Sequence, residues 1–117
     1  MKKIPKKITK SINELLILVD QVFGEKAKRV ILYGSYARGD FNRSSDIDVM
    51  ILTDLNEKEI EEFRNVIWEK CADIEIDEGI VISPLIRNID EFYSWSDVKP
   101  FYINILKEGV VLHGEKD

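Results

Sequence analysis

The chain has 117 residues, of which 44% are hydrophobic, and this is enough for one domain with one core but not for two. Its formal net charge of -5, from 22 acidic and 17 basic residues, argues against a DNA- or RNA-binding surface, which normally shows a strong basic excess. Cys71 is the one cysteine, and the apolar runs are too short to span a bilayer. We therefore expect a single domain over residues 1–117, cytoplasmic, with no membrane contact and no direct contact with nucleic acid.

The first half of the chain predicts a helix followed by two strands. Apolar residues recur at helical spacing over residues 8–22, and this amphipathic helix should end near Gly24. Residues 29–33 predict a short buried strand. Residues 36–45 are dense in Gly, Asp, Asn and Ser, which favours a loop or short helix, and strand character returns over residues 46–52.

The middle of the chain predicts a second helix and then β-prone segments. Asn56 and Glu59 form a capping-box pattern that should begin a helix running to about Lys70. Residues 74–86 are strongly β-prone but are interrupted by an acidic turn with a glycine. They fit one kinked strand or a hairpin whose second arm is residues 80–86, and we favour two pieces.

The last third predicts two helices and a short strand. Residues 90–95 and 100–107 are helical in pattern, and the second segment has Gly109 just past its end. Residues 110–112 predict a last strand. The order of elements indicates an α/β (α+β) fold in which a small mixed β-sheet is flanked by helices.

One stretch, residues 34–48, combines a glycine-serine turn, a ten-residue interval and two aspartates separated by one residue. In a strand, Asp46 and Asp48 would point to the same face and converge on one hard cation. Mg²⁺ suits such a pair, because it completes its ligand shell with water and substrate phosphate. Gly34 would let the backbone approach a phosphate closely, and Ser35 could donate a hydrogen bond to it. The stretch predicts a magnesium site beside a nucleoside triphosphate.

This pattern resembles the motif of the minimal nucleotidyltransferases of the DNA polymerase β superfamily, in which glycine-serine is followed after about ten residues by D-x-D. The closing segment, residues 100–109, is also similar to the end of bacterial and archaeal members. A D-x-D pair or a Gly-Ser pair alone is weak, but the joint spacing between two apolar strands is much more specific. The resemblance implies a polymerase β-type fold and transfer of NMP, most plausibly AMP, from ATP or another NTP to a hydroxyl.

Two arginines follow the glycine-serine turn. Arg38 and Arg43 could each steer phosphate, or each could be a solvated side chain that pins a loop. We place Arg38 in the nucleotide site as a hypothesis.

The resemblance further implies a third carboxylate on a neighbouring strand, which completes the metal site and can act as the base. Asp73, Glu75 and Asp77 alternate and would share one face of a continuous strand, and we assign Asp77 as the third catalytic residue beside the D-x-D pair. If the counterpart is instead the strand over residues 80–86, the matching place holds an uncharged residue such as Ser83.

Two functions from different classes remain open. In the first, the chain is an enzyme that modifies a hydroxyl of a separate protein, since so short a chain has little room for an acceptor domain. The resemblance implies that this partner is a HEPN-family toxin and that the chain is its antitoxin. In the second, the chain is a module that binds nucleotide and regulates the partner by masking it. Either is compatible with a homo-oligomer. A P-loop or dinucleotide-binding protein is disfavoured because neither glycine motif occurs.

Overall fold

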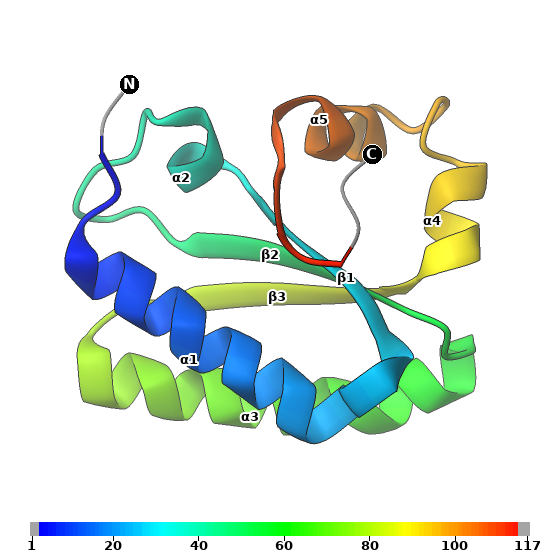
Figure 1. Cartoon of the computed structure of the whole chain (residues 1–117), viewed down its shortest axis with the longest axis horizontal. Coiled ribbons are helices and arrows are strands. Elements are labelled where there is room, and N and C mark those ends of the chain that lie inside the picture. Colours follow the sequence, from blue (N-terminus) through cyan, green and yellow to red (C-terminus); the bar gives the residue numbers. More distant parts are fainter. Residues whose placement is uncertain (1–2, 115–117) are drawn as a thin grey trace.

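A four-stranded mixed sheet in the order β3-β2-β1-β4 forms the centre of the protein (Figure 1). The structure is a computed structural model and describes residues 3–114. In chain order the elements are α1 (Lys6–Phe23), the 3₁₀ turn η1 (Gly24–Lys26), β1 (Ala27–Tyr33), α2 (Ser35–Arg38), β2 (Ile47–Thr53), α3 (Glu57–Glu78), β3 (Ile82–Asn88), α4 (Ile89–Ser94), α5 (Pro100–Glu108) and β4 (Val110–His113).

Helices cover both faces of this sheet. β1 runs antiparallel to β2 and to β4, whereas β2 and β3 are parallel. The pair α1 and α3 lies on one face, and α4 and α5 lie on the other (Figure 1). The predicted mixed sheet flanked by helices is therefore confirmed.

The central strand β2 explains why its sequence is an almost unbroken apolar run. Val49 and Ile51 belong to the core under α1 and α3, whereas Met50 and Leu52 belong to the core under α4 and α5. A strand covered on both faces needs apolar side chains at successive positions. Asp48 is the charged residue in this strand, and it has the same parity as the residues that face α4 and α5.

Helix α3 is longer than predicted, and its last turns replace an expected strand. Its start is as predicted, because the Asn56 side chain accepts from the Glu59 amide in a complete capping box. It then continues to Glu78 and ends where Gly79 takes a left-handed conformation with φ 71°. The alternation of Ile74 with acidic residues mimics a strand, but Ile74 also continues the buried stripe of α3 and packs on the core. The prediction of a first strand beginning at residue 74 is thus wrong, whereas the second predicted strand, residues 80–86, corresponds to β3.

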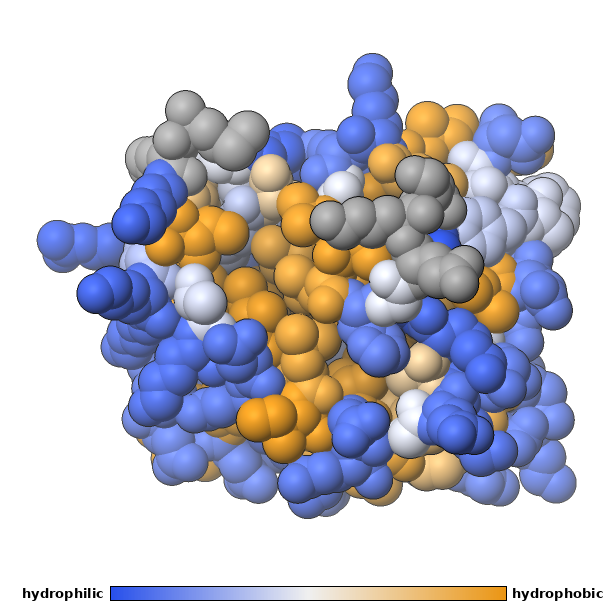
Figure 2. Space-filling model, viewed as in Figure 1, coloured by the Kyte–Doolittle hydropathy of each residue, from blue (hydrophilic) through white to orange (hydrophobic). Residues whose placement is uncertain are grey.

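The outer strand β3 carries a proline at Pro84, opposite Val49 of β2. At the other edge of the sheet, β4 has only four residues. Figure 2 shows apolar side chains gathered in the middle of one face, between α1 and β4. Leu16 of α1 and His113 of β4 line one small recess there. No helix within residues 3–114 is both long and apolar enough to cross a membrane.

Candidate active site

The glycine-serine turn lies directly beside the second aspartate of the D-x-D pair. β1 ends at Tyr33, which is opposite Asp48 in the β1–β2 register, and the chain then turns through Gly34 into α2. Gly34 has φ 78° and ψ -156°, a conformation that is essentially restricted to glycine. A Cβ atom at this position would overlap Oδ2 of Asp48 and lie 3.2 Å from its Cγ. Only a residue without a side chain lets the turn approach this carboxylate so closely.

A recess of about 360 Å³ opens between this turn and α5, and we call it the α5 recess. It contains Asp48 together with the predicted nucleotide-binding residues Gly34, Ser35 and Arg38. Its opposite wall is the face of α5 that carries Phe101, Asn104 and Glu108. The structure therefore brings four of the predicted site residues together in the α5 recess.

Asp46 lies just before β2 and lines a different recess from Asp48. It lines a second recess of about 530 Å³ between the start of α1, the loop after α2 and the α3–β3 turn, which we call the α1 recess. β2 begins at Ile47, so Asp48 lies within the strand and Asp46 directly precedes it, and the shared face of the two carboxylates stays a prediction. The two aspartates remain electrostatically coupled, and they form the boundary between the two recesses.

This coupling shows in the titration of the groups around the pair. Burial and then the charge of Asp46 raise the pKa of Asp48 above its ordinary value, while Arg38 opposes the shift. Burial and the Asp48 charge likewise raise the pKa of Tyr33 to about 12. Burial, followed by the Asp46 charge, raises the pKa of Tyr36. A carboxylate whose ionisation is disfavoured by a neighbouring carboxylate, as Asp48 is, lies in a suitable place for a cation.

The donor set suits Mg²⁺ with incomplete protein ligation. Within residues 3–114 no three His, Cys, Asp or Glu side chains lie close enough together to hold a metal. Asp46 and Asp48 supply two hard oxygen ligands, and Mg²⁺ commonly takes its other ligands from water and substrate phosphates. These residues fit a magnesium ion that arrives with a nucleotide.

Comparison with known proteins gives the family. The sequence pattern of the nucleotidyltransferase domain family matches residues 12–112, which include every element that forms the two recesses except the start of α1. The chain belongs to this family. This nucleotidyltransferase is 34% identical over 107 residues to a Methanocaldococcus jannaschii protein named "Putative protein adenylyltransferase MJ0604", covering 89% of this chain and 96% of the relative. It is 35% identical over 79 residues to "Putative protein adenylyltransferase MJ0141" of the same organism, covering 68% and 78%.

The nucleotidyltransferase also shares its fold with chains of solved toxin–antitoxin structures. One neighbour belongs to a mutant of the MntA–HpeT toxin–antitoxin, with a TM-score of 0.57, 17% identity and coverage of 89% of this chain and 73% of that chain. Another is a toxin–antitoxin solved with AMP-PNP, with a TM-score of 0.56, 21% identity and coverage of 88% and 73%. At these identities the likeness shows the fold alone.

The position of the third carboxylate departs from the expectation. Asp77 is exposed and lies in the last turn of α3, so its predicted place on a strand is wrong. The β3 residue beside Asp48 in the parallel register is Ser83. The β3 residue next to Asp48 is thus uncharged, which agrees with the second alternative from the sequence.

Arg38 lies in the α5 recess and also pins a loop. Its Nε is 3.1 Å from Oδ2 of Asp40, and its Nη1 is 3.5 Å from Oε1 of Glu108 across the recess. A phosphate entering the recess would compete with these carboxylates for the guanidinium.

The wall contributed by α5 was missed in the assignment of site residues. Phe101, Asn104 and Glu108 are spaced i, i+3 and i+7 and so lie on one helix face. The likeness of residues 100–109 to the end of family members was the signal that could have indicated them. Phe101 also packs edge-on against Tyr33 with ring centroids 5.6 Å apart, which joins this wall to the end of β1.

Proposed function

We propose that this nucleotidyltransferase transfers AMP from Mg²⁺-bound ATP to a hydroxyl of a partner protein. The observation that carries the proposal is the α5 recess, where Ser35, Gly34 and Arg38 line the same concavity as the half-buried Asp48. The two M. jannaschii relatives are named protein adenylyltransferases, which supports the choice of donor and acceptor.

Each side chain has a distinct part in this chemistry. Asp46 and Asp48 would hold the magnesium, which when bound neutralises charge on the phosphate oxygens during transfer. Gly34 leaves room for a phosphate beside Asp48, and the Ser35 hydroxyl donates a hydrogen bond to it. Arg38 exchanges a carboxylate partner for a phosphate oxygen.

The transfer itself is an in-line displacement at the α-phosphorus. A bond forms between the acceptor oxygen and the α-phosphorus, while the bond to the bridging α–β oxygen breaks and pyrophosphate leaves. Ser83 cannot accept the acceptor proton as a carboxylate would, so the proton passes to water or to a base carried by the partner.

We propose further that the partner is a HEPN-family helical toxin and that this chain is its antitoxin. Two fold neighbours are components of toxin–antitoxin complexes, which supports such a pairing. The net charge of -5 would favour contact with the basic face of an RNA-cleaving protein. The apolar area between α1 and β4 offers further surface for the contact (Figure 2).

A second function, masking without transfer, is favoured by one specific observation. Ser83 stands in register beside Asp48, so this β3 position does not supply a carboxylate base. A module of this kind would still bind MgATP through Asp46 and Asp48 and could occlude the toxin by complex formation alone.

The test is co-expression of the chain with the product of its adjacent gene. We expect co-purification, rescue of growth and a mass gain of one or more AMP units on the partner. The matched control carries Asp46→Asn and Asp48→Asn, which should abolish the mass gain while leaving the complex intact. A stable complex without added mass, in the presence of Mg²⁺ and ATP, would favour masking, and the absence of both complex and rescue would defeat the antitoxin proposal.

A further inference from the structure

The α1 recess is the larger of the two concavities at the D-x-D pair, and the nucleotide chemistry described above does not use it. It is lined by the start of α1, the loop after α2 and the α3–β3 turn, and the exposed Asp46 is one of its lining residues. Its volume of about 530 Å³ is within the range of roughly 300–1,000 Å³ that is typical of ligand sites. The recess is therefore large enough to receive a side chain together with its neighbours.

The geometry of displacement at phosphorus indicates which reactant this recess would hold. The entering oxygen and the leaving pyrophosphate must lie on opposite sides of the α-phosphorus. The phosphate-binding residues Gly34, Ser35 and Arg38 all line the α5 recess, so the pyrophosphate leaves on that side. The other recess at the aspartate pair is the α1 recess, which Asp46 lines. An acceptor that attacks on the side away from the pyrophosphate would then approach from the α1 recess.

The charge of the α1 recess is opposite to that of the whole chain. Lys3, Lys7 and Arg43 line it, and Asp46 is its single carboxylate. Among the residues that the structure describes, none of these three cations forms an ion pair, whereas Lys10, Lys28 and Arg38 each do. A Cβ on Gly79 would lie 3.9 Å from Nζ of Lys7, so this ammonium lies against the α3–β3 turn at the edge of the recess.

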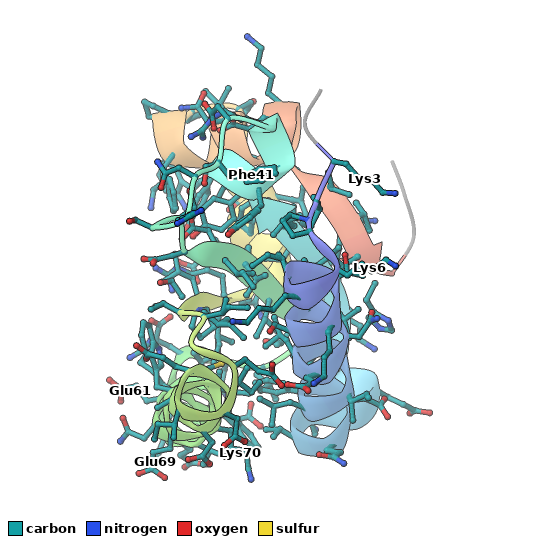
Figure 3. The ribbon with its side chains drawn as sticks, turned by 90° about the vertical axis from the view of Figure 1, so that its left-hand side faces the viewer. Lys3, Lys6, Phe41, Glu61, Glu69 and Lys70 are labelled. Atoms are coloured by element: carbon teal, nitrogen blue, oxygen red, sulfur yellow. The ribbon has the colours of Figure 1, made fainter. Side chains whose placement is uncertain are left out.

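The floor of the recess is apolar and aromatic. Tyr36 and Phe41 stack with ring centroids 4.8 Å apart and are 6% and 8% exposed. In Figure 3, Phe41 lies on the loop after α2, and Lys3 lies on the N-terminal segment across from it, with the Lys3 side chain directed away from Phe41. Such a floor suits the apolar part of a side chain whose polar end reaches Asp46.

We propose that the α1 recess binds the acceptor, and that the acceptor is an acidic segment of the partner protein. Carboxylates on both sides of the acceptor residue pair with Lys3, Lys7 and Arg43, and the acceptor hydroxyl then lies beside Asp46 on the side opposite the pyrophosphate. This inference rests on the proposed function and adds the location of the acceptor and the charge of its surroundings.

Nucleic acid is the other anionic candidate, and two observations disfavour it. Single-stranded nucleic acid is usually bound on exposed aromatic faces, but Tyr36 and Phe41 stack on each other and are almost completely buried. Three cations are also few against the net charge of -5, which repels a longer phosphate backbone.

The test measures binding of labelled peptides to the full chain in the presence of Mg²⁺ and a non-hydrolysable ATP analogue. The probes are a pentapeptide with a central tyrosine and two glutamates on each side, the same peptide with glutamines, and a five-nucleotide RNA. Lys7→Glu with Arg43→Glu reverses two charges of the recess, and the neutral pair Lys7→Gln with Arg43→Gln is a milder version. The matched control is Lys6→Glu, because Lys6 is exposed and does not line this recess.

We expect the glutamate peptide to bind more tightly than the glutamine peptide and the RNA. The charge-reversal pair should weaken its binding by about tenfold or more, the neutral pair should weaken it less, and Lys6→Glu should leave it almost unchanged. The affinity for the ATP analogue should stay as in the parent. With labelled ATP, the same pair should raise the KM for the peptide while the KM for ATP is unaltered.

Two results separate this inference from the proposed function. Equal binding of the glutamate peptide to the parent and to both Lys7 and Arg43 pairs would overturn the acceptor assignment, whatever the transfer assay gives, and so would tighter binding of the RNA. Peptide binding that depends on Lys7 and Arg43 without any transfer of AMP would instead support the recess as the docking place and contradict the enzyme proposal.

Discussion

The contact between Gly34 and Asp48 makes Gly34→Ala the sharpest single test of the site. The new methyl group would overlap the Asp48 carboxylate, and the alanine would also have to keep φ near 78°. A non-glycine residue in such a conformation costs about 1–3 kcal/mol, and displacing the carboxylate adds to that. We expect a loss of stability of at least this size in urea unfolding, and loss of MgATP binding in calorimetry.

Gly24→Ala is the matched control for this experiment. Gly24 also has a positive φ, 55°, but a Cβ there meets nothing within 4 Å, and it lies at the end of α1 away from both recesses. It should lose stability by the same backbone cost of about 1–3 kcal/mol and bind MgATP as the parent does. If Gly34→Ala binds MgATP with unchanged affinity, the proposed approach of phosphate to this turn is refuted.

Four other substitutions probe the same site. Asp46→Asn and Asp48→Asn should each remove Mg²⁺-dependent ATP binding in calorimetry with the fold intact; unchanged affinity in both would disprove the metal site. The folded state raises the pKa of Asp48, so ionisation of this carboxyl lowers the stability of the fold as pH rises through that pKa. Without nucleotide, Asp48→Asn should therefore melt at a higher temperature than the parent at neutral pH. This gain should vanish in acid, where Asp48 of the parent is protonated. Ser35→Ala should weaken ATP binding by about 1.5–3 kcal/mol, the usual loss for one hydrogen bond to a charged group, and parent-like affinity would reduce this turn to a structural role. Glu108→Gln frees Arg38 from one carboxylate and should tighten ATP binding modestly in the same assay, whereas looser binding would show that the ion pair holds Arg38 in place for phosphate.

The sequence predicted what local patterns determine. The apolar runs of β1 and β2, the capping box at Asn56 and the spacing from Gly34 to Asp48 all depend on neighbours along the chain, and the structure has each of them. The end of α3 could not be obtained in this way, because residues 73–77 satisfy both a strand period and a helix period. Only packing of Ile74 on the core decides between the two.

The arrangement of the site was predictable to a lesser extent. That Asp46 and Asp48 border different recesses depends on where β2 begins and on the α3–β3 turn, which is far away in the sequence. The identity of the residue beside Asp48 needed the β2–β3 register, and a register cannot be read until the strands are known.

The proline of β3 has a consequence for how two copies of this chain could associate. Pro84 has no amide hydrogen, so the free side of this outer strand cannot provide a regular ladder of donors to another sheet. The opposite edge, β4, extends for only four residues and offers a short template at most. Formation of a continuous sheet across two protomers is thus disfavoured at β3 and limited to a few residues at β4. Self-association through side chains on the helical layers would leave the backbone hydrogen bonding of each sheet complete within one molecule.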